Sequence, residues 1–142
     1  KLNLDADGIS DLLNKKSGVL GITELSSDMR EVEAACEKGE PKAVLAMKMY
    51  NYRIKKYIGA YAAAMGGVDI IVFTAGVGEN QWSTRQESCE GLEFLGVEID
   101  KELNKGLRGV EKVISTANSK VTVCIIPTDE ELMIATDTMN LL

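Results

Sequence analysis

The sequence predicts an α/β fold, rich in helix, with a small parallel or mixed sheet. The run at residues 68–73 is β-branched or aromatic except for Asp69, which is typical of a strand buried on both faces. This strand leads directly into a turn that contains Gly76 and Gly78, where positive φ or close approach to the backbone is possible. A second apolar strand at residues 121–126 ends at Pro127. Helical patterns flank both strands, as expected of an α/β unit.

Two short helices are predicted before the long helix that precedes the first strand. Residues 8–15 carry apolar side chains on one helical face, and residues 19–27 are expected to form a connection. Residues 29–38 predict a second helix, which Asp28 caps while Glu31 reaches back as in a capping box.

The longest predicted helix begins at Pro41, because the fixed φ of proline suits the first helical position. It is expected to end at Gly66. Large side chains recur along it at three- and four-residue steps, which predicts a buried stripe. The stripe consists of Met47, Tyr50, Ile54, Tyr57, Ile58, Tyr61 and Met65.

The remaining elements are weaker predictions. Asn80 can cap a helix that follows the glycine turn, and either Thr128 or Asp129 can cap the last helix. In chain order these elements are a helix at 81–94, a helix at 100–107, a short strand at 113–115 and a helix at 130–139.

Composition limits the possible functions. The 142 residues predict a single domain, and the net charge of −6 argues against binding to a nucleic-acid backbone. No apolar run is long enough to span a membrane, and no secretory signal is visible. Three well-separated cysteines without a Cys-x-x-Cys pair predict reduced thiols in a cytoplasmic protein.

The sequence contains no histidine. This excludes Ser-His-Asp and Cys-His catalytic arrangements and any histidine metal ligand within the chain. Acid–base chemistry would depend on carboxylates, lysine, tyrosine or cysteine.

Several separated motifs, in this order and spacing, resemble the C-terminal part of acetate kinases. The resemblance covers nearly the whole chain and, with the start at Lys1, indicates a piece of a longer protein. The motifs are LNKKSG at 13–18, SSDMR at 26–30, FTAGVGEN at 73–80, LEFLGV at 92–97 and IPTDEEL at 126–132. The resemblance implies the actin-like ATPase fold, also called ribonuclease H-like. It also implies that the missing strands of the sheet lie in an absent N-terminal part.

The resemblance also implies site residues for ATP or ADP and for Mg²⁺. The resemblance implies that Glu130 is the Mg²⁺ ligand. From its position alone, Glu130 is an acid in the first turn of a helix, where the helix dipole stabilises it, and the same holds for Glu131. The implied nucleotide-binding residues are Asp28, Met29, Arg30, Gly76, Val77, Gly78, Glu79, Asn80 and Arg85.

Local alternatives exist for several of these residues. Asp28 can be a helix cap and Arg30 a solvated cation. Arg85 can be a plain surface residue. The two glycines can simply permit a tight turn between strand and helix, without any ligand. A dinucleotide-binding domain that uses Gly76-x-Gly78 is a further alternative. It is disfavoured because its motif needs a third glycine at the position of Gln81.

The family resemblance implies reversible phosphoryl transfer between ATP and acetate to give acetyl phosphate and ADP. It also implies that acetate and acetyl phosphate bind through the missing N-terminal part and that the whole protein is a homodimer. No catalytic residue is expected in this chain, so the isolated chain is predicted to be inactive. The alternatives are a propionate or butyrate kinase of the same superfamily, or a non-catalytic nucleotide-binding or dimerisation module.

Overall fold

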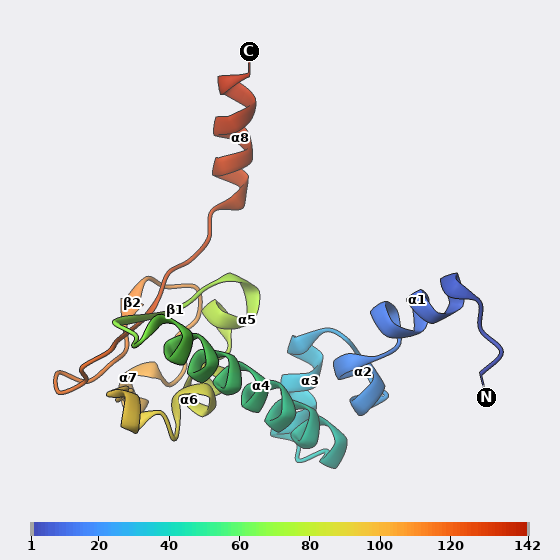
Figure 1. The fold of residues 1–142 in the computed structure, drawn as a ribbon, viewed down its shortest axis with the longest axis horizontal. Coiled ribbons are helices and arrows are strands. Elements are labelled where there is room, and N and C mark those ends of the chain that lie inside the picture. Colours follow the sequence, from blue (N-terminus) through green and yellow to red (C-terminus); the bar gives the residue numbers. More distant parts are fainter. Residues whose placement is uncertain (1, 142) are drawn as a thin grey trace. The chain divides into compact units, whose positions relative to one another are not determined.

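The computed structural model describes residues 2–141 (Figure 1). Contacts divide the chain into two compact units, with the boundary between Tyr57 and Ile58. Each unit is described by itself.

The first unit is helical. It contains α1 (Ala6–Lys15), α2 (Gly18–Thr23), α3 (Met29–Glu37) and the first part of α4 (Pro41–Met65). The expectation of a plain connection at 19–27 is wrong, because α2 occupies much of that stretch. This six-residue helix is too short to show a period, and its N-cap residue Ser17 makes no side-chain capping bond.

The core of the first unit joins α3 to the start of α4. Val32 and Ala35 on α3 pack with Ala43 and Met47 on α4, and Met29 lies partly buried against them. Val32 and Ala35 therefore lie on the inward face of α3.

The buried face of α4 differs from the predicted stripe. Met47 is buried, but Tyr57, Tyr61 and Met65 are exposed, so the prediction is wrong for these three residues. The buried side chains are smaller: Ala43, Ala46, Asn51 and Ala62, together with Met47. Small residues let a neighbouring element approach closely, whereas tyrosine keeps its hydroxyl in water.

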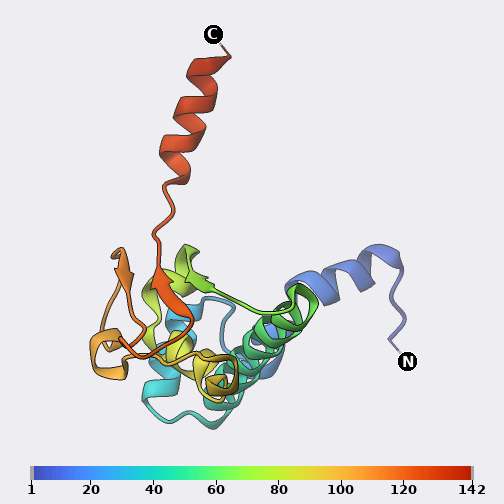
Figure 2. The same ribbon diagram turned by 60° about the vertical axis from the view of Figure 1, so that its left-hand side comes forward.

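The second unit is built on a three-stranded sheet with the order β1-β3-β2 (Figure 2). The strands are β1 (Ile70–Phe73), β2 (Lys112–Val113) and β3 (Thr122–Ile125). The pair β1 and β3 is parallel, with Ile70 opposite Thr122, and the pair β2 and β3 is antiparallel. The predicted small mixed sheet is thus confirmed.

Only one face of β1 is buried. Ile71 and Phe73 lie in the core, while Ile70 and Val72 are exposed, so the expectation of two buried faces is wrong for the described chain. Within residues 2–141, β1 is an edge strand and its second face carries no cover. The core side of the sheet packs against Cys89, Leu92, Val97 and Ile114, among others.

The second unit contains the helices α5 (Ala75–Asn80), α6 (Trp82–Cys89), α7 (Lys101–Asn104) and α8 (Glu130–Asn140), with a 3₁₀ turn, η1, at Glu93–Leu95. Two of these helices, α6 and α7, are shorter than predicted, α8 has nearly its predicted length, and α5 was expected to be a turn. The single helix expected at 81–94 ends at Cys89, because Glu90 takes ψ 130° and Gly91 takes φ 79°.

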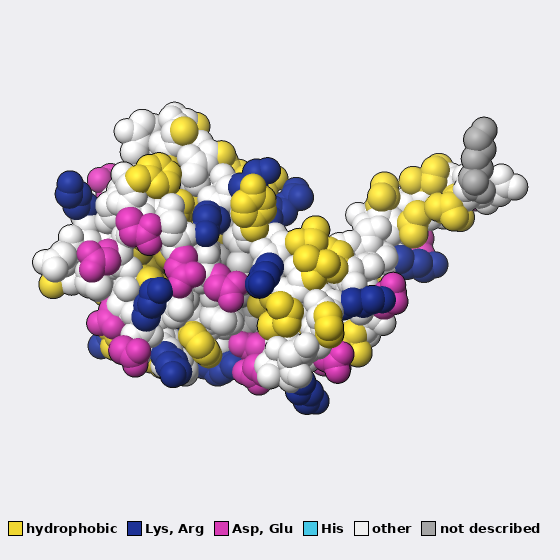
Figure 3. Space-filling model, turned by 90° about the horizontal axis from the view of Figure 1, so that it is seen from below, with side chains coloured by type: hydrophobic (Ala, Val, Ile, Leu, Met, Phe, Trp, Pro, Cys, Tyr) yellow, Lys and Arg dark blue, Asp and Glu magenta, His cyan; other side chains and the backbone are white. Residues whose placement is uncertain are grey.

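The described surface mixes charges with apolar groups. Figure 3 shows acidic, basic and hydrophobic side chains interspersed on one face. Every residue of α8 is exposed, including Leu132, Met133 and Ile134. In residues 2–141, no helix has both the length and the apolarity needed to cross a membrane.

Candidate nucleotide-binding site

The glycine turn after β1 is itself a short helix. Residues 76–80 lie within α5, and the residue that takes a left-handed conformation is Ala75, with φ 57°. Neither Gly76 nor Gly78 has positive φ. Of the two possibilities, positive φ is therefore excluded for these glycines, and close approach to the backbone stays a prediction.

The two glycines differ in their surroundings. A Cβ added at Gly78 would lie 3.1 Å from the carbonyl carbon of Phe73, whereas a Cβ at Gly76 would meet nothing within 4 Å. Gly78 thus allows α5 to fold back against the end of β1. Gly76 leaves an open patch of backbone.

Asn80 does not cap α6. Its Nδ2 donates to the carbonyl oxygen of Gly76 at 2.9 Å, within its own helix. The N-cap of α6 is Gln81, which makes no side-chain capping bond. The predicted cap is wrong because α5 extends through Asn80 and leaves no free turn there.

Arg85 is fully buried, which excludes its interpretation as a surface residue. Its Nη1 donates to the carbonyl oxygens of Gly78 and Glu79 at 2.8 and 3.0 Å, and its Nη2 donates to that of Leu107 at 2.8 Å. These acceptors include the last carbonyls of α5, where a cation is favourable. This role of Arg85 was not predicted, because residues 76–80 were expected to form a turn and not a helix with its own C-terminal carbonyls.

Asn104 belongs to the same network and was not predicted. Its Oδ1 accepts from Nε of Arg85 at 2.8 Å, and its Nδ2 donates to the carbonyl oxygen of Trp82 at 2.9 Å. The side chain is fully buried. A lone asparagine in a charged helix carries no signal of this role, because its partner lies 19 residues away.

Glu79 connects α5 to the segment before α8. Its Oε1 accepts from the backbone N–H of Thr128 at 2.8 Å and from the Thr128 hydroxyl at 3.0 Å. The Thr128 N–H, more than its hydroxyl, lowers the pKa of the Glu79 carboxyl. The side chain of Val77, in the same turn, is partly buried.

In the first unit, Asp28 caps α3 as predicted. Its carboxylate accepts from the N–H of Arg30 at 2.9 Å and pairs with the Arg30 guanidinium at 2.6 Å. This pairing lowers the pKa of Asp28 to about 2. The backbone N–H of Asp28 donates to Ser26 Oγ. In the predicted capping box Glu31 would accept this N–H, so that part of the prediction is wrong. The Arg30 side chain is exposed to solvent, and its ion pair with Asp28 restricts its position.

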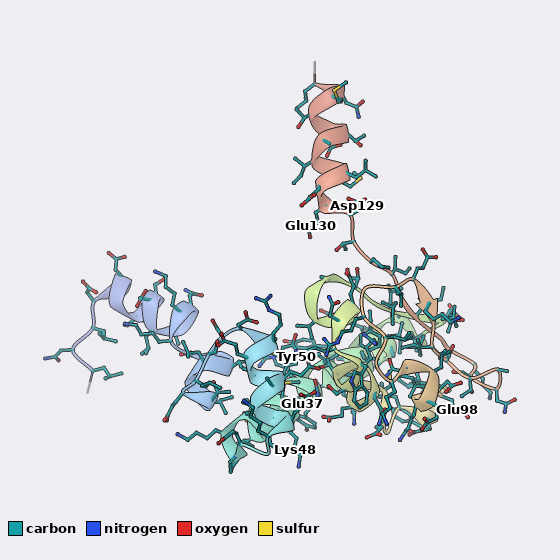
Figure 4. The ribbon with its side chains drawn as sticks, turned by 180° about the vertical axis from the view of Figure 1, so that it is seen from behind. Glu37, Lys48, Tyr50, Glu98, Asp129 and Glu130 are labelled. Atoms are coloured by element: carbon teal, nitrogen blue, oxygen red, sulfur yellow. The ribbon has the colours of Figure 1, made fainter. Side chains whose placement is uncertain are left out.

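Glu130 is the first residue of α8, and Asp129 is its N-cap, accepting from the N–H of Leu132 at 3.0 Å. Figure 4 labels both acids at the start of the helix. Glu130 is exposed, and its carboxylate makes no ion pair with another described residue.

The carboxylates of the described residues fit a Mg²⁺ site only if nucleotide phosphates bind the same ion. Among residues 2–141, no cluster of three or more His, Cys, Asp or Glu could hold a metal ion. A single exposed carboxylate fits the usual Mg²⁺ arrangement, in which one or two carboxylates share the ion with phosphates and water. Glu130 would be that carboxylate.

The arrangement of strand, close helical turn and following helix belongs to the actin-like ATPase fold, the fold of acetate and propionate kinases. The family described as the acetokinase family matches residues 1–136. The chain belongs to the acetokinase family.

Individual relatives agree with this assignment. The chain is 69% identical to an acetate kinase of Phocaeicola vulgatus over 142 residues, all of this chain and 35% of the relative. It is 61% identical to an acetate kinase of Parabacteroides distasonis, again over the whole chain and 36% of the relative. The chain thus spans about a third of the length of these curated relatives.

Solved structures give the same result. The crystal structure of Porphyromonas gingivalis acetate kinase matches 96% of this chain and 34% of that chain, at 62% identity and a TM-score of 0.90. A propionate kinase from Francisella tularensis subsp. tularensis SCHU S4 matches the whole chain and 36% of that chain, at 37% identity and a TM-score of 0.87.

Proposed function

We propose that this chain is the C-terminal part of an acetate kinase and supplies nucleotide-binding segments of its active site. The observation that carries this proposal is the match along the whole chain to relatives named acetate kinase, one of them 69% identical. The whole protein would transfer a phosphoryl group reversibly between ATP and acetate, giving ADP and acetyl phosphate.

In this proposal, each unit supplies nucleotide-binding residues of its own. The exposed Arg30, held by Asp28, offers a planar cation for the adenine ring, with Met29 beside it. The open backbone at Gly76 lets the nucleotide approach α5 closely. Arg85 contributes indirectly, because its guanidinium is already bonded to the carbonyls that end α5.

Glu130 would hold Mg²⁺ together with the nucleotide phosphates. The bound ion supplies charge neutralisation for those phosphates. The chain's own part is to present a carboxylate at the first turn of α8, held in place by the Asp129 cap. No residue of this chain is proposed to act on the acyl group, so we expect that chemistry from the remainder of the protein.

A propionate kinase is the second candidate, because a solved propionate kinase matches the whole chain. Steady-state kinetics of the full-length protein with acetate, propionate and butyrate test the choice. We expect the highest kcat/KM with acetate. A higher value with propionate would replace the first proposal by the second, and no turnover with any of the three acids would overturn both.

The cytoplasmic location and the homodimer are also proposals. The exposed Tyr61 and Met65 on α4 offer apolar surface that a second subunit could cover. Sedimentation of the full-length protein measures the oligomeric state directly.

A further inference from the structure

Two hydrogen bonds between Glu79 and Thr128 link α5 to the segment that precedes α8. Glu79 belongs to α5, the proposed nucleotide segment, and Thr128 stands two residues before Glu130. The partners are 49 residues apart in sequence. One carboxylate therefore connects the segment proposed to approach the nucleotide with the segment proposed to hold its metal ion.

The connection is short and charge-assisted. Both Thr128 donors reach the same oxygen, Oε1 of Glu79, at 2.8 and 3.0 Å. Hydrogen bonds to an ionised acceptor are stronger than bonds between neutral groups. The backbone N–H of Ala75 also supports the carboxylate and contributes to its lowered pKa.

The segment between β3 and α8 has little else to hold it. Its N–H at Ile126 donates to the carbonyl oxygen of Phe73 at 3.0 Å, and Thr128 makes the two bonds to Glu79. Beyond this point every described residue is exposed. The direction in which the first turn of α8 points therefore depends on the bonds at Phe73 and Glu79.

A direct contact between Glu79 and the nucleotide is less favourable. A carboxylate next to phosphate oxygens is repelled by their charge. The Oε1 atom of Glu79, in addition, already accepts two hydrogen bonds.

We infer that Glu79 is a positioning residue that holds the Thr128 segment against α5, so that Glu130 and the nucleotide phosphates meet at one Mg²⁺ ion. This inference rests on the proposed function. It differs from that function in giving Glu79 a role in the coupling between Mg²⁺ and nucleotide, in place of nucleotide binding itself.

The test uses the full-length protein and measures ADP affinity by calorimetry with and without Mg²⁺. Glu79→Ala loses both Thr128 bonds, so we expect the tightening of ADP binding by Mg²⁺ to fall by about tenfold or more, the factor expected for even one hydrogen bond to a charged group. The ADP affinity without Mg²⁺ should change much less. A general loss of structure would weaken both affinities together.

Matched variants refine the test. Glu79→Gln keeps an oxygen that can accept both Thr128 donors, so it should retain most of the Mg²⁺ effect. Thr128→Ser keeps the hydroxyl and should behave like the wild type, whereas Thr128→Val loses one of the two bonds and should fall between wild type and Glu79→Ala. Hydrogen exchange at the Thr128 amide should speed up in Glu79→Ala and much less in Glu79→Gln.

The outcomes separate the inference from the proposed function. If Mg²⁺ tightens ADP binding equally in wild type and Glu79→Ala, the inference is overturned and the role of Glu130 stands. If Mg²⁺ has no effect on ADP binding in the wild type, the proposed metal role of Glu130 is overturned together with the inference. Equal loss of ADP affinity with and without Mg²⁺, at an unchanged melting temperature, would make Glu79 a nucleotide contact and would also overturn the inference.

Discussion

At the scale of single residues, the segment after β1 combines strain with close packing. Ala75 takes φ 57°, which costs an L-residue about 1–2 kcal/mol. Three residues later, Gly78 packs against the Phe73 backbone. Strained backbone tends to persist at functional sites, where the surrounding structure holds it in place. The open face at Gly76 is the part of this turn that a ligand can reach.

The two glycines of α5 allow a matched test of nucleotide approach. Gly76→Ala has room for its Cβ and lies in a helix, so we expect stability unchanged or raised by about 0.5–1 kcal/mol. Its ADP affinity in the full-length protein should nevertheless fall, with the KM for acetate unchanged. Gly78→Ala should lower stability by about 1–3 kcal/mol, because its Cβ would press on backbone.

Thermal unfolding and ADP titration of both glycine variants provide the measurement. Unchanged ADP affinity in Gly76→Ala would contradict nucleotide approach at that position. A fall in acetate affinity as large as the fall in ADP affinity would assign the turn another role.

Glu130 and Glu131 form a second matched pair, since both are exposed acids in the first turn of α8. Each should contribute a similar helix-dipole stabilisation of about 0.3–1 kcal/mol. In the full-length protein, Glu130→Ala should raise the Mg²⁺ concentration for half-maximal activity and strongly lower turnover. Glu131→Ala should do much less.

Kinetics over a range of Mg²⁺ concentrations, together with melting temperatures, decide between metal binding and helix stability. Equal kinetic losses in the two variants, or losses that simply follow the melting temperature, would leave Glu130 without a metal role.

At the scale of elements, a buried cation joins short helices that have few other means of support. Arg85 lies on α6, bonds to the last carbonyls of α5, and contacts Asn104 at the end of α7. Helices as short as α5 and α7 are unstable alone, because few of their backbone bonds are internal. The Arg85 network therefore determines the local shape on which the glycine turn depends.

Loss of the Arg85 side chain should be costly. Arg85→Ala leaves the buried Asn104 Oδ1 and three carbonyls of partly buried residues without their donor, so we expect stability to fall by about 3 kcal/mol. Arg85→Lys retains the charge but cannot reproduce the planar set of donors, and it should fall between wild type and alanine.

Denaturant unfolding of the full-length protein measures the effect of the Arg85 variants. Arg53→Ala, which removes an exposed arginine of α4, provides the control and should change stability by less than about 0.5 kcal/mol. A loss in Arg85→Ala no larger than in the control would show that the network does not support the fold.

At the scale of the whole molecule, the residues proposed for nucleotide binding fall in both units of the chain. Arg30 belongs to the first unit, and α5 and Glu130 belong to the second. The chain lacks histidine, and its relatives are about three times as long. Phosphoryl transfer works by positioning and electrostatic stabilisation of both reactants, so a chain without the acyl-binding groups should lack turnover.

The isolated chain is therefore predicted to show no acyl kinase activity with acetate and ATP at any concentration. The measurement is acetyl phosphate formation by a highly purified sample, compared with the full-length protein at equal molarity. Turnover that persists through further purification would contradict the prediction and require a second site within these residues.

The sequence by itself determined the local elements and the family. The apolar runs predicted β1 and β3, and Pro41 and Gly66 marked the ends of α4. Asp28 marked one helix start, and either Thr128 or Asp129 marked another. These features depend on neighbours within a few residues, so their signals are present in short stretches of sequence. The spaced motifs likewise identified the family without reference to packing.

Only the tertiary structure decided how these elements use their side chains. It placed Tyr61 of α4 in solvent, buried Arg85, gave Gly78 a packing role and paired Glu79 with Thr128. The physical reason is sequence distance: the acceptors of Arg85 reach Leu107, 22 residues away, and Glu79 meets a partner 49 residues away. Helical periodicity reports that a face is apolar, whereas contact with a distant segment decides which face is covered.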